Sequence, residues 1–173
     1  MHNLNVEALK ATAELATKDP TAVVQQVKLG GEWQTAEGSP QFRTEIPLPS
    51  GKTVTFEADF PPAMGGTGSA PNPLAYCFWG GIACYAMTFA QEAALHGVEI
   101  RSLRARVEAS VDMSRALGVS DRPPVEQINW SLEVDSEATA DQLAELKQRS
   151  DDGCPGAWCI RNPVALETEV VAA

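Results

Sequence analysis

The sequence predicts an α+β fold in which antiparallel sheets surround one long, buried central helix. Three observations predict it. An uncharged apolar stretch with helical boundaries runs through the middle of the 173-residue chain. Segments with the two-residue alternation of half-buried strands precede and follow this stretch. These strands come in runs and do not alternate one by one with helices, which is typical of antiparallel sheets.

The central helix is expected over residues 72–97. Its middle is apolar or glycine at every position except Thr88, so the helix lacks a polar face and belongs in an interior. Asn72 is a candidate N-cap, Pro73 suits the first helical position and Gly97 suits the residue just past the end. One chain of this length supplies too little cover for such a helix, so we expect a dimer that wraps two such helices.

Upstream of the central helix, the sequence predicts a leading helix and a group of strands. Residues 1–20 carry good helix formers until Asp19-Pro20 ends the pattern. The glycine-rich run Met64–Pro71 lacks the Lys-Ser/Thr ending of a phosphate-binding loop, so we expect a plain connection there. Three strands are expected within residues 21–70, at Val23–Trp33, Phe42–Leu48 and Thr53–Phe60, the last two joined as a hairpin by the turn Pro49-Ser50-Gly51-Lys52.

Downstream, residues 98–173 are expected to form strands and one amphipathic helix. Thr139 and Gln142 fit a capping box, and the helix that follows should continue to about Arg149. Strands are expected over residues 102–113, over residues 128–134, and at the end of the chain through Val164, Leu166 and Val170. No repeat and no change of composition marks a boundary, so residues 1–173 are expected to form a single domain.

Charge and composition exclude several classes of function. The net charge is −10 and no block of Lys or Arg is present, so nucleic acid is not an expected partner. The N-terminus has no apolar core of the kind that a signal peptide needs, which indicates a cytoplasmic protein. The central stretch is short for a membrane span and has no basic flank, so no membrane association is expected.

Four cysteines are the residues most able to carry chemistry. In a reducing compartment they are not expected to form structural disulfides, which leaves catalysis, redox sensing, metal binding or packing as their role. Cys77 and Cys84 are two helical turns apart and face the same way. Cys84 lies too deep in the helix for the helix dipole to activate it, so a reactive Cys84 needs an arginine. The alternative is that both are small buried hydrophobic residues.

The segment APNPLAYCFWGGIACYAMTFAQEAALHGVEIRSLRARVEA, followed later by CPGAWCIRNPV, resembles the OsmC/Ohr family of thiol-dependent hydroperoxide reductases. The shared features are the Asn-Pro helix start, the cysteine eleven positions after that proline, the Gly-Val-Glu-Ile helix exit and the late Cys-Pro. Upstream, FRTEI and PPAMGGTGSAPNP resemble the larger OsmC-like branch of the family. The resemblance therefore covers most of the chain.

This resemblance implies an enzyme of the oxidative stress response that reduces organic hydroperoxides to alcohols without a cofactor or bound metal. Cys84 would be the peroxidatic cysteine, and Cys154 would resolve its sulfenic acid as a Cys84–Cys154 disulfide that an external dithiol reduces. The resemblance also implies an intertwined homodimer with these sites at the subunit interface. The apolar surround that would favour organic peroxides, or another small apolar electrophile, consists of Phe78, Trp79, Tyr85, Met87, Phe89 and Trp158.

The sequence departs from the family at the groups that activate the thiol. Family peroxidases carry a Glu one or two positions after the helix-opening proline, where this chain has Leu74 and Ala75. The family's Arg after an early Gly-Gly is replaced by Glu32. Arg43 is the substitute candidate. Its alternative role is that of a solvent-facing strand residue beside Glu45.

Cys77 and Cys159 are additional to the family pattern. They could relay a disulfide outward, join Cys84 and Cys154 in a soft-metal site, or only pack. Two functions therefore stand beside the peroxidase. One is a non-enzymatic thiol module that senses oxidants or holds a soft metal through all four cysteines. The other is an OsmC-like scaffold that binds an apolar ligand in the pocket between two subunits and whose thiols are vestigial.

Overall fold

The computed structural model describes residues 3–172, which form two compact units. The thiol unit comprises the described residues up to 10 together with those from 80 onward, and the hairpin unit comprises residues 11–79. Each unit is described by itself. The expectation of a single domain over residues 1–173 stays a prediction.

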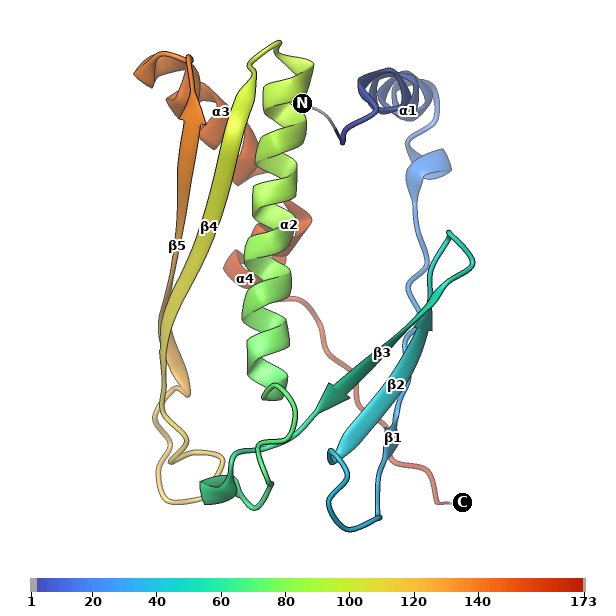
Figure 1. Cartoon of the computed structure of the whole chain (residues 1–173), viewed down its shortest axis with the longest axis vertical. Helices are drawn as coiled ribbons and strands as arrows, with labels where there is room; N and C mark the ends of the chain where they lie inside the picture. The colour runs from blue at the N-terminus through green and yellow to red at the C-terminus, as the bar shows by residue number, and fades with distance from the viewer. Residues whose placement is uncertain (1–2, 173) are drawn as a thin grey trace. The chain divides into compact units, whose positions relative to one another are not determined.

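A three-stranded antiparallel sheet is the framework of the hairpin unit (Figure 1). Its order is β1-β2-β3, and the register places Arg43 opposite Glu57. Gly51, in the turn between the last two strands, has the left-handed φ of 81° that glycine adopts without strain. The predicted hairpin is thus confirmed. The strands are β1 (Glu32–Trp33), β2 (Phe42–Pro47) and β3 (Thr53–Ala58).

The N-terminal helix α1 (Val6–Lys18) is confirmed, but the strand predicted over Val23–Trp33 is wrong for most of its length. A 3-10 turn, η1 (Pro20–Val23), begins at the N-cap Asp19, and only the two residues of β1 pair with β2. Residues 24–31 are apolar at several exposed positions and form no ladder with the described chain. β-branched residues favour strands only where a neighbouring strand accepts their hydrogen bonds.

The predicted central helix is α2 (Pro73–Leu95), which follows the loop and 3-10 turn η2 (Pro62–Met64). Asn72 caps it, because its Oδ1 accepts a hydrogen bond from the N–H of Leu74 at 2.9 Å. Gly97, past its end, has a φ of 71°. Within residues 3–172, no helix is long and apolar enough to cross a bilayer.

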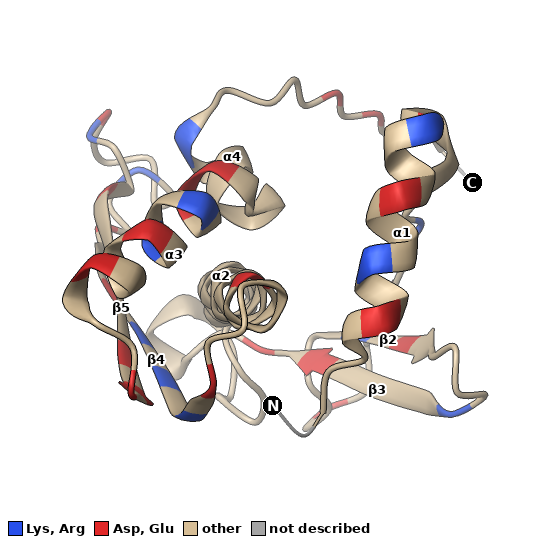
Figure 2. Ribbon diagram, turned by 90° about the horizontal axis from the view of Figure 1, so that it is seen from above, with Lys and Arg blue, Asp and Glu red and all other residues tan. Residues whose placement is uncertain are grey.

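The burial expected on every face of α2 is not reached within one chain. The helix carries a single charged residue, Glu92, and appears almost uniformly uncharged in Figure 2. Its fully buried side chains lie three or four positions apart and so share one face, whereas Trp79 and Met87 are 63% and 64% exposed. The buried residues are Ile82, Tyr85, Phe89 and Ala93.

The thiol unit combines part of α2 with an antiparallel hairpin and two further helices. The hairpin strands confirm the two predicted strands that follow the central helix, although the first begins and ends two residues earlier than expected and the second is longer than expected. α3 begins with the predicted capping box, in which Thr139 and Gln142 bond reciprocally. The elements are β4 (Ile100–Val111), β5 (Val125–Ser136), α3 (Ala140–Gly153) and α4 (Pro155–Arg161).

Two apolar clusters hold the thiol unit together. In one, Phe89 and Ala93 of α2 pack with Leu146 of α3 against the apolar face of the hairpin. In the other, Ile82 and Tyr85 of α2 pack with residues at the start of α4, and Trp130 of β5 covers them. The second cluster contains a cysteine from each side and is the foundation of the site described below.

The strand predicted at the C-terminus is wrong. The residues before it, Pro155 to Arg161, fold as the helix α4, because Pro155 suits the first helical position and Cys154 caps the helix. Residues 163–172 have no regular structure, and Leu166 and Val170 are 85% and 98% exposed. As at residues 24–31, the sequence has the pattern of a strand, but no strand of the described chain pairs with it.

Candidate thiol site

Two cysteines from distant parts of the sequence meet in the thiol unit. Cys84 lies midway along α2, and Cys154 lies between α3 and α4. Their Sγ atoms are 3.6 Å apart and both thiols are free. A disulfide requires about 2.05 Å between the sulfurs, so a small side-chain movement would bring this pair to bonding distance. Cys154 is fully buried, with an exposed fraction of 0%, whereas Cys84 is half-buried.

Cys154 is fixed by both helices that it joins. Its N–H donates to the carbonyl of Ser150 at 3.0 Å, which closes the last turn of α3. Its Sγ accepts a hydrogen bond from the N–H of Ala157 at 3.4 Å, which caps the first turn of α4. The orientation of this sulfur is therefore coupled to the position of α4.

Two glycines, one on α4 and one on α2 itself, allow close packing against α2. A Cβ on Gly156 would lie 3.1 Å from Cβ and 3.3 Å from Sγ of Cys84, closer than most side-chain contacts. A Cβ on Gly81 would lie 2.8 Å from Cζ2 of Trp130. The first turn of α4 therefore sits directly on Cys84, and the indole of Trp130 covers the helix one turn away.

The single chain holds Cys84 as a neutral thiol. Burial raises the pKa of Cys84, the backbone hydrogen bond with Gly156 lowers it by less, and the neighbouring Cys154 raises it further. The net direction is upward, so the protonated form dominates at neutral pH. A thiolate at this position requires a positive charge that offsets the burial.

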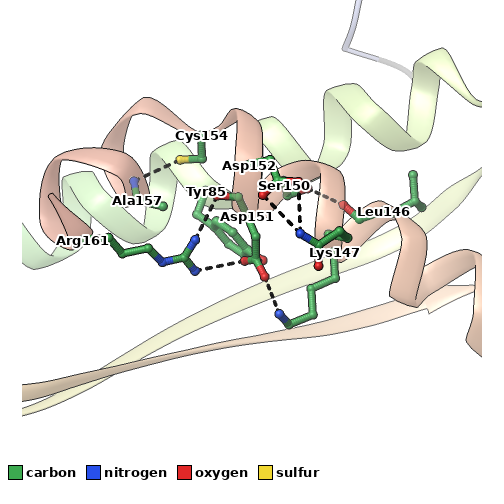
Figure 3. Close-up of polar contacts among 10 residues, drawn as sticks. Tyr85, Leu146, Lys147, Ser150, Asp151, Asp152, Cys154, Ala157 and Arg161 are labelled. Atoms are coloured by element: carbon green, nitrogen blue, oxygen red, sulfur yellow. Dashed lines mark hydrogen bonds and ion pairs between the residues drawn. The ribbon is translucent and has the colours of Figure 1, made fainter.

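One carboxylate, that of Asp151, connects the elements that carry the two thiols (Figure 3). Its Oδ1 accepts a hydrogen bond from the hydroxyl of Tyr85 at 2.8 Å and pairs with Arg161 at 3.2 Å. Its Oδ2 pairs with Lys147 at 2.5 Å. Burial raises the pKa of Asp151, but the hydrogen bonds from Lys147, Tyr85 and Arg161 lower it by more, so the carboxylate stays ionised. Burial and this same carboxylate raise the pKa of Tyr85.

The family model for OsmC-like proteins matches residues 66–169, which is more than half of the chain. The chain belongs to the OsmC-like family. Its fold is similar to that of three solved structures that each cover most of both chains. An OsmC-like protein from Mycoplasma pneumoniae is 17% identical, with 79% of this chain and 89% of that one covered and a TM-score of 0.52. OsmC from Legionella pneumophila, an organic hydroperoxide resistance protein, is 16% identical, with 80% of this chain and 92% of that one covered and a TM-score of 0.53. An OsmC-like protein of unknown function from Vibrio cholerae is 11% identical, with 78% of this chain and 92% of that one covered and a TM-score of 0.55. No curated protein matches the chain.

Of the residues that the sequence indicated as a substrate pocket, only Tyr85 is packed with the thiol pair in this OsmC-like chain. Phe78 is half-buried, and Phe89 belongs to the other apolar cluster. Tyr85 also lines a cavity of about 340 Å³ together with Trp130, whose buried Nε1 has no hydrogen-bond partner among the described residues. The exposed members of the predicted pocket are Trp79, Met87 and Trp158, at 63%, 64% and 54%.

The remaining predicted residues are exposed, and two of them belong to the hairpin unit. Arg43, on β2 of the hairpin unit, pairs with Glu45 at 3.2 Å, and both side chains are about half exposed. Cys77 and Cys159 are exposed. Within residues 3–172, no three His, Cys, Asp or Glu side chains are arranged to hold a metal ion.

Sequence reasoning missed Asp151 and Arg161. A signal was present, since Asp151 lies one helical turn before Cys154 and Arg161 has the opposite charge. That signal depended on recognising α4 as a helix, because only the helix returns Arg161 to the end of α3. Gly156 was missed for the same reason.

Proposed function

We propose that this OsmC-like protein is a thiol-dependent peroxidase that reduces organic hydroperoxides to alcohols. Cys84 is the peroxidatic cysteine and Cys154 the resolving one. The observation that carries the proposal is the 3.6 Å separation of two free sulfurs contributed by residues 70 positions apart. The solved structure from Legionella pneumophila, similar in fold, is described as an organic hydroperoxide resistance protein, which favours the same chemistry.

The proposed cycle has three steps. The Cys84 thiolate attacks one oxygen of the hydroperoxide, the O–O bond breaks, and the alkoxide leaves as alcohol after taking a proton. The sulfur of Cys154 then attacks the resulting sulfenic acid, so that an S–S bond forms and water leaves. An external dithiol finally reduces the disulfide by two exchange reactions and is itself oxidised to a disulfide.

Arg43 is the proposed source of the charge that activates Cys84. Because burial raises the pKa of the thiol, an offsetting cation is needed for the first step. The guanidinium of Arg43 is already held by Glu45 at 3.2 Å. An arginine oriented by a carboxylate is the arrangement that the family resemblance implies, and here Glu45 takes the place of the glutamate that is absent at Leu74 and Ala75.

The proposed assembly is a homodimer in which a second copy covers the exposed apolar side of α2. Trp79 and Met87 lie eight residues apart on this helix, a little over two turns, and each exposes more than 60% of its surface. Large exposed apolar residues grouped on one element are typical of interaction surfaces. In the dimer these side chains, with Trp158, would complete the apolar surround of the substrate.

The test is the intact mass of the reduced protein before and after one equivalent of cumene hydroperoxide, with peptide mapping. A fast loss of about 2 Da that maps to Cys84–Cys154 is expected. C154S should instead stop at the sulfenic acid, with a gain of about 16 Da. C159S is the matched control and should form the bridge as the wild type does. Thiols that stay reduced over minutes, or a bridge between other cysteines, would contradict the proposal.

An apolar-ligand-binding scaffold is the second candidate function. A cavity of about 360 Å³ lined by Tyr85, Phe89, Trp130 and Leu132 favours it, and so does the raised pKa of Cys84. Under this alternative the protein would bind an apolar fluorescent probe, and the L132W variant, which fills the cavity, would lose that binding. Cumene hydroperoxide would not oxidise the thiols.

A further inference from the structure

We propose that Asp151 is a positioning residue that keeps the Cys84 and Cys154 sulfurs at reacting distance, acting through Arg161 and Tyr85. The inference rests on the proposed function, because it concerns how readily the Cys84–Cys154 bridge forms. Asp151 itself touches neither sulfur in the contacts described above.

α4 needs an external anchor. It has seven residues, and an isolated helix shorter than about 12 residues is marginal in water. Its Trp158 and Ile160 side chains are 54% and 49% exposed, and the irregular residues 163–172 follow it. Only Ala157 places a fully buried side chain from α4 in the core.

Arg161 supplies the anchor at the end of α4. Its Nη1 donates to the backbone carbonyl of Asp151 at 2.9 Å, and its Nη2 contacts the Asp151 carboxylate at 3.2 Å. These contacts fold the last residue of α4 back onto the last turn of α3 (Figure 3). Cys154 is the N-cap of α4, so a helix held at its far end keeps the sulfur of Cys154 in a defined place.

Tyr85 supplies the matching connection to α2. It is the residue next to Cys84, its side chain is 6% exposed, and its hydroxyl donates to Oδ1 of Asp151 at 2.8 Å. The same oxygen atom therefore contacts one residue from the helix of each cysteine. Tyr85 also packs against the indole of Trp130 with ring centroids 5.6 Å apart, so the ring is held on its other side.

The expected consequence concerns the effective concentration of one thiol at the other. When two groups are held in the reacting geometry, the entropy of bringing them together has been lost in advance, and bond formation is favoured. If the contact between Arg161 and Asp151 is removed, α4 samples a wider range of positions and the Cys154 sulfur spends less time near Cys84. The disulfide then becomes less stable relative to the two thiols.

The experiment is the thiol–disulfide equilibrium of the full-length protein in reduced and oxidised glutathione, read by acid quench, alkylation and peptide mass. R161Q removes the anchor and leaves Tyr85 and Lys147 on Asp151. R149Q is the matched control, because it removes a 2.8 Å ion pair with Glu145 on the exposed face of α3. Y85F removes only the hydroxyl and keeps the ring, so it serves as second variant if R161Q does not fold.

We expect R161Q and Y85F each to lower the ratio of disulfide to dithiol by about 5- to 30-fold, and R149Q to change it less than about twofold. The urea unfolding of the reduced and oxidised forms is measured in parallel. A purely structural role would destabilise both forms equally and leave the ratio unchanged, which would overturn the inference. If the wild type forms no Cys84–Cys154 bridge in glutathione, both this inference and the proposed function fail. If the wild type forms the bridge and the variants have the same ratio of disulfide to dithiol, only this inference fails.

Discussion

The backbone of Gly156 lies directly against the side chain of Cys84. A Cβ on Gly156 would be 3.1 Å from Cβ and 3.3 Å from Sγ of Cys84, and 3.6 Å from the carbonyl oxygen of Gly81. The approach brings the N–H of Gly156 into a hydrogen bond with Cys84 and seats the first turn of α4 on α2. Glycine at this position therefore determines how closely the two thiols meet.

We predict that G156A separates the thiols and destabilises the fold. The added methyl group meets side-chain and backbone atoms of α2, so either Cys84 changes rotamer or α4 moves outward. Overpacking of this kind costs about 1–3 kcal/mol. The unfolding free energy in urea should fall by that amount, and the rate of bridge formation with cumene hydroperoxide should fall several-fold.

G153A is the control for this prediction. Gly153 is the last residue of α3, its φ is not positive, and a Cβ there would have no atom within 4 Å. Replacing glycine by alanine within a helix should stabilise the protein by about 0.5–1 kcal/mol and leave the bridge unaffected. Equal behaviour of the two variants would show that the contact between Gly156 and Cys84 is unimportant.

Sequence signals that act within a few residues predicted their elements well. Asn72 and Pro73 marked the start of α2, and Thr139 with Gln142 marked the start of α3. The strands that pair with each other within a hairpin, β2 with β3 and β4 with β5, were also predicted. The strands expected at residues 24–31 and 164–170 were wrong, because a strand needs a ladder partner and the described chain offers none there.

The site was predictable only in part, for the same physical reason. The family resemblance implied a relation between Cys84 and Cys154, and their sulfurs lie 3.6 Å apart, although the chemistry of the pair stays a prediction. The Asp151 contacts depend on a tertiary arrangement of three helices, one of which is too short to show a clear pattern. No local periodicity in the sequence indicates which side chains of these three helices come into contact.

We predict that Arg43 lowers the pKa of Cys84 in the active assembly. Burial alone raises that pKa, so without the cation the thiolate fraction at neutral pH falls, and reactivity rises only as the pH passes above the ordinary thiol value of about 8.5. R43Q should therefore slow the alkylation of Cys84 at pH 7 by about tenfold or more, which corresponds to one pKa unit. Its rate should still be increasing where the wild-type rate has levelled off.

The measurement is the pH profile of iodoacetamide labelling at Cys84, followed by peptide mass. R104Q is the control, because Arg104 is an exposed strand residue that only loosely pairs with Glu133, at 3.9 Å. Its profile should coincide with that of the wild type. Superimposable profiles for R43Q and R104Q would remove Arg43 from the mechanism.

We predict that the external reductant attacks the bridge at Cys84 and that Cys154 leaves. Cys154 is 0% exposed, so an incoming thiol cannot reach its sulfur, whereas Cys84 is half-buried. The departing sulfur of Cys154 also retains its hydrogen bond from the N–H of Ala157 at 3.4 Å. Brief treatment of the diamide-oxidised protein with glutathione, followed by acid quench, should place glutathione on Cys84.

The exposed thiols Cys77 and Cys159 would also be oxidised by diamide, so the experiment uses the C77S/C159S variant, in which Cys84 and Cys154 are the remaining thiols. Glutathione found on Cys154 would mean that α4 opens before reduction. The prediction is independent of the peroxide reaction, since diamide forms the bridge without a hydroperoxide.

We predict that the W79E/M87E variant is a monomer while the wild type is a dimer. A stable interface buries at least about 1,000 Å², and apolar side chains at its centre contribute most of the affinity. A buried, unpaired carboxylate is costly, so two glutamates on the exposed side of α2 should prevent the association. V119E is the control, since Val119 is 72% exposed but lies in the loop between β4 and β5. The measurement is sedimentation velocity, and a dimeric W79E/M87E variant would place the interface elsewhere. If the variant is a monomer that keeps its stability in urea but loses Cys84 oxidation, the site requires the second copy.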